Sequence, residues 1–192
     1  IALMHSSFFN IRRILGFLKL KIFFVLILIS SISFSQEKKK IEILRAGSLE
    51  ADEKIAANAQ RLIDTVLIRH NDILLYCDSA YTYTGTNRVD AFGNVHVNQG
   101  DTMHLYANKV FYNGDISFAR AIKNVRLESK TTTLFTDTLD YDLEAKIGYY
   151  NTSGTIVDST NTLTSTVGKY FVDDNLVHFY TDVEGFNENY TL

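Results

Sequence analysis

A repeat of about 29 residues is the feature that most limits how this chain can fold. Four similar segments open on a leucine: LYCDSAYTY from Leu75, LYANKVFYN from Leu105, LFTDTLDYD from Leu134 and LTSTVGKYF from Leu163. The last residue, Leu192, lies one further repeat along the chain. A fixed period of this length predicts a stack of similar supersecondary units, each packing on its neighbours.

A second anchor position lies about twenty residues into the units. Val95 in GNVHV, Val125 in KNVRL and Val183 in TDVEG occupy it, and Val66 in IDTVLI lies one repeat before Val95. Val66 therefore predicts an earlier, partly degenerate unit. The third unit departs from the pattern, because SGTIV places Ile156 two positions late.

The composition of the units predicts β-strands with one dry face. Thr, Tyr, Val, Phe and Leu are frequent, and apolar residues alternate with polar ones, as in Val95 and Val97 around His96. Turn-forming residues follow at 85–87, 99–101, 113–115 and 151–154. Two strands in each repeat unit predict an all-β stack.

Each opening segment is predicted to bend in its middle. Small or apolar side chains stand two and five positions after the leucine, as at Cys77 and Ala80, and these offsets have opposite parity. A bulge or bend near Asp78, Asn108 and Asp137 is needed to bring both side chains to one face.

The stretch from Leu49 to Val66 carries two competing signals. Its apolar residues fall at 55, 59, 62, 63 and 66 among Ala, Glu, Lys and Gln, which is the spacing of an amphipathic helix. The register of Val66 with Val95 favours strands instead. We expect strands, because tertiary context overrides local propensity.

Residues 1–35 have the features of an export signal. A basic stretch ends at Lys21, the apolar run IFFVLILI follows, and the small residues Ser33 and Ser35 precede Gln36 as the expected first mature residue. An uncleaved anchor is the alternative, although the run is shorter than the roughly 20 residues of a membrane span. The sequence thus predicts a signal peptide at 1–35 and one domain at 36–192.

The net charge and the cysteine content limit the classes of function that this protein can have. Removing the four basic residues of the signal leaves 15 basic and 22 acidic residues, which changes the net charge from −3 to −7. An acidic exported chain is a poor candidate for nucleic-acid binding, which depends on neutralising phosphates. The single Cys77 excludes an internal disulfide and fits a small buried side chain in an oxidising compartment.

Four stretches of the sequence resemble a known family. The stretches IEILRAGSLEADEKI, RLIDTVLIRHNDILLYCDSAY, TNRVDAFGNVHVNQGDTMHLYANKVFY and LTSTVGKYF are similar to OstA-like (organic solvent tolerance, LptA-like) proteins of lipopolysaccharide transport, in the form typical of Bacteroidetes-type bacteria. The resemblance covers about residues 41–192.

The resemblance implies a β-jelly roll of open, folded-over antiparallel sheets, whose dry interior holds the acyl chains of lipopolysaccharide. At about 0.8 kcal/mol per methylene, a chain of a dozen carbons costs on the order of 10 kcal/mol to expose to water. It also implies a non-catalytic carrier or bridge in the periplasm, on the way to or associated with the outer membrane. Its partners are expected to be other transport proteins, or copies of itself, joined head to tail through terminal strands.

Ten apolar residues are predicted to face this trough. They are the repeat anchors and their same-face neighbours: Leu75, Val95, Val97, Leu105, Val110, Val125, Leu127, Leu134, Leu139 and Ile156. The alternative is that they form the packed core of an ordinary sandwich. Since the chain stops at the Thr-Leu that opens another unit, we also expect it to continue in a longer protein.

Catalytic and metal-binding patterns are weak. His96, Asp101 and His104 flank a predicted turn and are expected to be solvent-facing polar residues. Asp137, Asp140 and Asp142 lack the Gly and terminal Glu of a calcium loop. No G-x-S-x-G nucleophile elbow occurs. The sequence therefore predicts no enzyme, no cofactor and no metal.

Two other function classes remain open. A secreted β-solenoid enzyme acting on polysaccharide would share the repeats, but should carry a carboxylate or basic cluster on one exposed stripe. A structural or adhesive surface array would keep the repeats and fill its interior completely. Lipid binding separates both from a transport module.

Overall fold

The computed structural model describes residues 40–51, 56, 58–100, 102–187 and 190–191 of the 192-residue chain. The chain divides into two units, 1–38 and 39–192, and the predicted signal peptide falls in the first, outside the described residues. Among the described residues every regular element is a strand, and none forms a helix long and apolar enough to cross a bilayer. The all-β prediction is confirmed.

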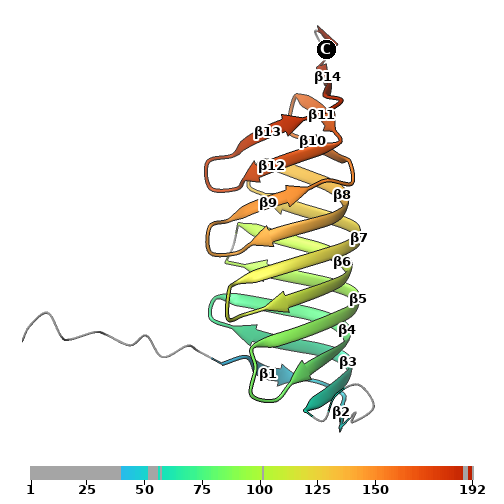
Figure 1. Cartoon of the computed structure of the whole chain (residues 1–192), viewed down its shortest axis with the longest axis vertical. Coiled ribbons are helices and arrows are strands. Elements are labelled where there is room, and N and C mark those ends of the chain that lie inside the picture. The colour runs from blue at the N-terminus through green and yellow to red at the C-terminus, as the bar shows by residue number, and fades with distance from the viewer. Residues whose placement is uncertain (1–39, 52–55, 57, 101, 188–189, 192) are drawn as a thin grey trace, which may run out of the picture. The chain divides into compact units, whose positions relative to one another are not determined.

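The described residues of the second unit form fifteen strands, which stack along it (Figure 1). Their bounds are β1 (Glu42–Arg45), β2 (Ser48–Ala51), β3 (Ala59–His70), β4 (Ile73–Tyr83), β5 (Arg88–Gln99), β6 (Met103–Asn113), β7 (Phe118–Ser129), β8 (Thr132–Asp142), β9 (Ile147–Tyr150), β10 (Gly154–Val157), β11 (Asn161–Ser165), β12 (Val167–Phe171), β13 (Leu176–Tyr180), β14 (Glu184–Asn187) and β15 (Tyr190–Thr191). Every pairing between them is antiparallel, and β3 to β8 follow one another in sequence order.

The strand prediction for 49–66 holds over the residues that the structure describes. β2 and β3 cover most of this stretch and pair with each other, whereas 52–55 and 57 lie outside the described residues. The helical spacing is overridden because Leu62 and Val66, four positions apart, both point inward from a strand that bends between them.

A bend divides each long strand into two halves. Pairing shifts register between Tyr76 and Ser79 of β4, and Cys77 and Ala80 on either side of the bend are both buried, as predicted. The bends opposite Asn108 and Asp137 have the same form. At each bend, the neighbouring strand contains one extra residue. Two consecutive residues with positive φ turn that strand, at 64–65, 93–94 and 123–124.

The bends create two layers that face each other. The leucine layer contains 66–70, 73–77, 95–99, 103–107, 125–129 and 132–136, and continues through β10, β11 and β14. The alanine layer contains 59–63, 79–83, 88–92, 109–113, 118–122 and 138–142, and continues through β9, β12 and β13. Beyond β8 the bend becomes a break in the strand, so the layers continue as separate strands.

Side-chain hydrogen bonds connect the bends along the stack. Asn94 Nδ2 donates to Asp78 Oδ2 at 2.9 Å, and Asn124 Nδ2 donates to Asn108 Oδ1 at 2.9 Å. Thr166 Oγ1, further along the stack, donates to an oxygen of Asp182 at 3.0 Å. The polar residues Asp78 and Asn108, repeated at two of the bends, therefore stabilise the corner between the two layers.

The third unit keeps the register of the others, so its expected irregularity is corrected. Ile156 pairs with Leu134, as Val97 pairs with Leu105, and Gly154 occupies the anchor position of Val125. A Cβ on Gly154 would come within 2.5 Å of the Tyr150 ring. Glycine stands there because that ring already fills the space that a valine takes elsewhere.

Candidate functional site

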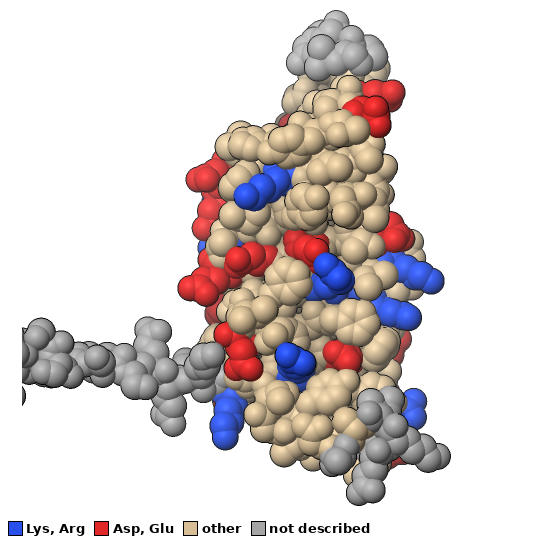
Figure 2. Space-filling model, viewed as in Figure 1, with Lys and Arg blue, Asp and Glu red and all other residues tan. Residues whose placement is uncertain are grey.

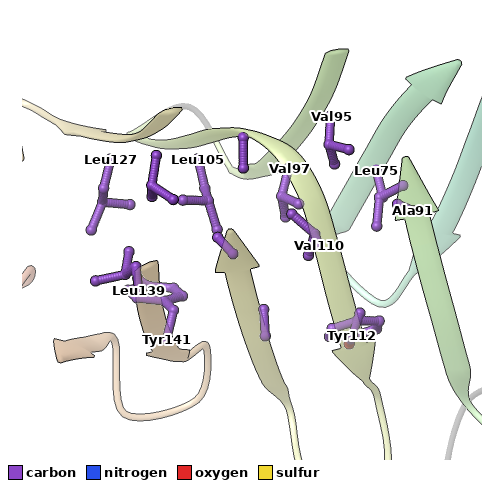
Figure 3. Packing of buried hydrophobic residues seen from close by; sticks show 14 of the residues in the cluster. Leu75, Ala91, Val95, Val97, Leu105, Val110, Tyr112, Leu127, Leu139 and Tyr141 are labelled. Atoms are coloured by element: carbon purple, nitrogen blue, oxygen red, sulfur yellow. The ribbon is translucent and has the colours of Figure 1, made fainter. Parts of the chain in front are cut away.

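The space between the two layers is lined almost wholly by apolar side chains. All ten residues predicted to face a trough lie there, and none is more than 3% exposed. They belong to one continuous cluster with residues from every strand between β3 and β12 except β11 (Figure 3). Burial alone fits a packed core as well as a lipid-binding surface, so the role of these residues in binding stays a prediction.

The leucine layer contributes an unbroken row of large side chains. Leu75 pairs with Val97, Val97 with Leu105, and Leu105 with Leu127. The row then continues from Leu127 through Leu134 to Ile156. Since each residue contacts its neighbour across the ladder, six of the ten predicted residues form one apolar stripe that crosses six strands.

The opposite layer contributes smaller side chains. Ala80 pairs with Ala91, Ala91 with Val110, and Val110 with Ala121, which pairs with Leu139. A row of large residues thus faces a row of mostly small ones, and leucine side chains occupy the space between the layers (Figure 3).

Inward-facing tyrosines form a third row that the sequence analysis missed. Tyr112, Tyr141 and Tyr170 follow one another at the repeat spacing and are at most 5% exposed. Burial raises the pKa of Tyr112 and of Tyr141 above the usual value for a phenol. Their periodicity was visible in the sequence, but tyrosine is too often a surface strand residue to be assigned inward without the bend geometry.

The histidines considered for a metal site lie on the outer face of the leucine layer. His96 Nε2 and His104 Nδ1 are 3.1 Å apart, and the His96 ring stacks on Tyr106 with a centroid distance of 4.4 Å. Partial burial and the neighbouring His104 lower the pKa of His96. Asp101 lies outside the described residues, and no group of three metal-ligating side chains occurs in the part that is described.

The three aspartates with calcium-like spacing have separate structural roles. Asp137 lies at a bend, and Asp140 forms an ion pair with Arg120 at 2.6 Å. Asp142 Oδ1 accepts hydrogen bonds from the backbone N–H groups of Glu144 and Ala145, at 3.0 and 2.8 Å. Their oxygens therefore serve turns and ion pairs instead of converging on one point.

Cys77 is a buried filler of the interior. It is 6% exposed, and burial raises the pKa of its thiol to about 12. A nucleophilic cysteine requires the opposite shift, because the thiolate is the reactive form.

The outer surface carries a groove of its own near the corner. It has a volume of about 820 Å³, and its lining includes six Thr and Ser residues and the acidic Asp182 and Glu184, together with Tyr106, Arg126 and Phe135. On the face drawn in Figure 2, acidic and basic side chains are interspersed, without a broad basic surface. The apolar interior is therefore the feature on which a functional argument can be built.

Comparisons with known proteins agree with this architecture. The family model described as OstA-like protein matches residues 38–192. Among solved structures, the chain is similar to LptH from Pseudomonas aeruginosa, described as the LptA-homologous periplasmic component of the lipopolysaccharide transport device. The two are 16% identical with a TM-score of 0.52, and the match covers 59% of this chain and 83% of that one. This likeness confirms the predicted β-jelly roll, whereas no curated protein matches significantly.

Proposed function

The chain belongs to the OstA-like family, and from this premise we propose that it is a non-catalytic module that carries or bridges lipopolysaccharide across the periplasm toward the outer membrane. The observation that carries the proposal is the continuous apolar interior, which extends along the stack between two layers joined by bent strands. A carrier of this kind keeps acyl chains out of water over the whole distance that they travel.

The ends of the stack support head-to-tail assembly with a second copy or with other transport proteins. At one end the edge strands β1 and β2 present exposed apolar side chains, namely Ile43, Leu44 and Leu49. At the other end, Leu176 and Tyr180 of β13 and Phe186 of β14 are at least 48% exposed. Strand edges with apolar neighbours pair readily with another strand, which would extend the interior from one protein into the next.

Lipopolysaccharide binding by interior variants tests the proposal. Leu105→Gln and Val125→Gln place an amide in the apolar interior, and each is expected to weaken binding at least tenfold, because the acyl chains would have to desolvate that amide. Phe135→Gln is the matched control, since Phe135 is 44% exposed on the outer face of β8 and its replacement is expected to leave binding unchanged. Circular dichroism verifies that each variant retains its strands.

Either of two results would contradict the proposal. One is a wild-type protein that does not bind lipopolysaccharide, which would favour a structural or adhesive array. The other is binding that survives both interior changes. Loss of binding in Phe135→Gln together with that result would place the lipid on the outer groove.

A further inference from the structure

The side of the stack opposite the corner carries two rows of turns, and the structure connects these rows in a regular way. The leucine-layer turns lie at 71–72, at 100 and 102, at 130–131 and at 158–160, and the alanine-layer turns lie at 84–87, 114–117, 143–146 and 172–175. Backbone hydrogen bonds join successive alanine-layer turns lengthwise, from Gly114 N to Asn87 O, Leu143 N to Ser117 O and Val172 N to Lys146 O. We call the line between the two rows the seam.

Among the described residues, four hydrogen bonds with a side-chain partner cross the seam. One joins Ile41 N to Asn87 Oδ1 at 3.2 Å, and the other three lie at repeating intervals. His70 Nδ1 lies 2.6 Å from the Tyr112 hydroxyl, and Gln99 Nε2 donates to the carbonyl oxygen of Leu143 at 3.1 Å. Thr132 Oγ1 lies 2.7 Å from Asn175 Oδ1 and donates to it. The partners are 42, 44 and 43 residues apart, which is one and a half repeats. These three contacts, here called clasps, are a periodic feature of the architecture.

The middle clasp is incomplete. Gln99 and Tyr141 lie one repeat after His70 and Tyr112, so they occupy the positions of the first clasp. The Gln99 Oε1 atom and the Tyr141 hydroxyl are both buried and have no hydrogen-bond partner among the described residues. Tyr170, the next in the tyrosine row, does have a partner, because its hydroxyl donates to Asn175 Oδ1 at 3.0 Å.

We propose that the seam is the side entrance for the acyl chains of an amphiphilic lipid and that the three clasps hold it shut, the middle one opening first. The inference rests on the proposed function and adds the route to it. At the corner the two layers are joined by continuous backbone from β3 to β8, whereas at the seam only turns and side chains meet. Parting the layers at the seam therefore breaks side-chain contacts and leaves the strands intact.

The chemistry of an amphiphile favours this route over threading through an end. A lipid with a large polar headgroup cannot travel lengthwise between two closed apolar layers, because the headgroup would lose its hydration. An opening along the seam lets the chains enter sideways while the headgroup stays in water. Among the three clasps, only the middle one contains buried polar atoms without a hydrogen-bond partner among the described residues, namely the Tyr141 hydroxyl and Gln99 Oε1. This makes it the weakest of the three.

A reversible crosslink across the seam tests the proposal. In a Cys77→Ala background, Thr132→Cys with Asn175→Cys replaces the third clasp by a disulfide or a short bifunctional thiol reagent, since the native side chains are already in contact. The matched control is Lys146→Cys with Asp173→Cys. This pair replaces a 3.0 Å ion pair between two turns of the same row and does not cross the seam.

Uptake of fluorescent lipopolysaccharide is measured before and after reduction. The closed cross-seam variant is expected to load at least tenfold more slowly than its reduced form, and closing it after loading is expected to trap the lipid. The control pair is expected to load at the wild-type rate in both states. Thr132→Val, which removes one clasp hydroxyl and keeps the side-chain shape, is expected to load several times faster than wild type.

The possible results distinguish a failure of the side-entrance proposal from a failure of the carrier proposal. Equal loading by the open and closed cross-seam variants, with normal binding by the wild type, would overturn the side entrance and leave the carrier proposal intact. Slow loading by the closed control pair as well would also overturn it, because a general stiffening would then explain the effect. A wild type that takes up no lipopolysaccharide would overturn both proposals.

Discussion

At the scale of single residues, position within the bent strand decides the role of a side chain more than residue type does. Tyr112 and Tyr141 stand at equivalent positions of successive repeats, but the Tyr112 hydroxyl contacts His70, whereas the Tyr141 hydroxyl has no partner among the described residues. The same buried phenol is therefore stabilising in one repeat and costly in the next.

Replacing each of these tyrosines by phenylalanine tests the difference. Tyr112→Phe is expected to lower the free energy of unfolding by about 1–2 kcal/mol, because it leaves His70 without this contact. Tyr141→Phe is expected to leave stability unchanged or raise it by about 1 kcal/mol, since it removes only an unsatisfied hydroxyl. Urea unfolding measures both, and equal losses would show that the Tyr141 hydroxyl is in fact bonded.

Gly154 offers a second test at this scale, because the repeat places a valine there. Gly154→Val is expected to destabilise the fold by about 1–3 kcal/mol, since the new side chain would overlap the Tyr150 ring. The double variant with Tyr150→Ala should lose less stability than the sum of the two single losses, because alanine at position 150 leaves room for the valine. Thermal unfolding of the two single variants and the double variant gives the coupling energy between the two positions. Additive losses would show that residues 150 and 154 do not compete for the same space.

At the scale of elements, the sequence predicted the strands and their inward faces better than it predicted the bends. The alternation at Val95 and Val97 and the leucine spacing suffice to assign strands and burial. The opposite parity of Cys77 and Ala80 correctly required a bend. It did not show which strand holds the extra residue, because Lys123 and Asn124 adopt positive φ without a glycine to mark the site.

The bend at Gly93 can be tested by adding one methyl group. Gly93 has φ of +73°, and a Cβ there would lie within 3.0 Å of three Asp78 side-chain atoms, so Gly93→Ala is expected to cost about 2–3 kcal/mol through strain and overlap. Gly85→Ala is the control, because Gly85 has φ of +82° with no atom within 4 Å and should cost only about 1 kcal/mol. Equal costs in urea unfolding would show that the bend tolerates a side chain.

At the scale of the whole molecule, the repeat period identified the stack, but it could not show how the interior is closed. All ten predicted residues are buried in one cluster, because inward alternation is enough to locate an interior. The clasps join residues 42 to 44 positions apart, and that spacing follows from the offset between the two layers, which is a property of their packing and not of any one unit.

The most direct test of the carrier claim is to ask which face of the stack contacts the lipid. A photo-crosslinking aromatic amino acid replaces either Tyr141, which is fully buried on β8, or Tyr149, which is 43% exposed on the neighbouring β9. Both variants are irradiated with lipopolysaccharide, and the covalent adducts are counted by gel shift and mass spectrometry. We expect adducts at position 141 and few at position 149; adducts at 149 with none at 141 would contradict lipid binding in the interior.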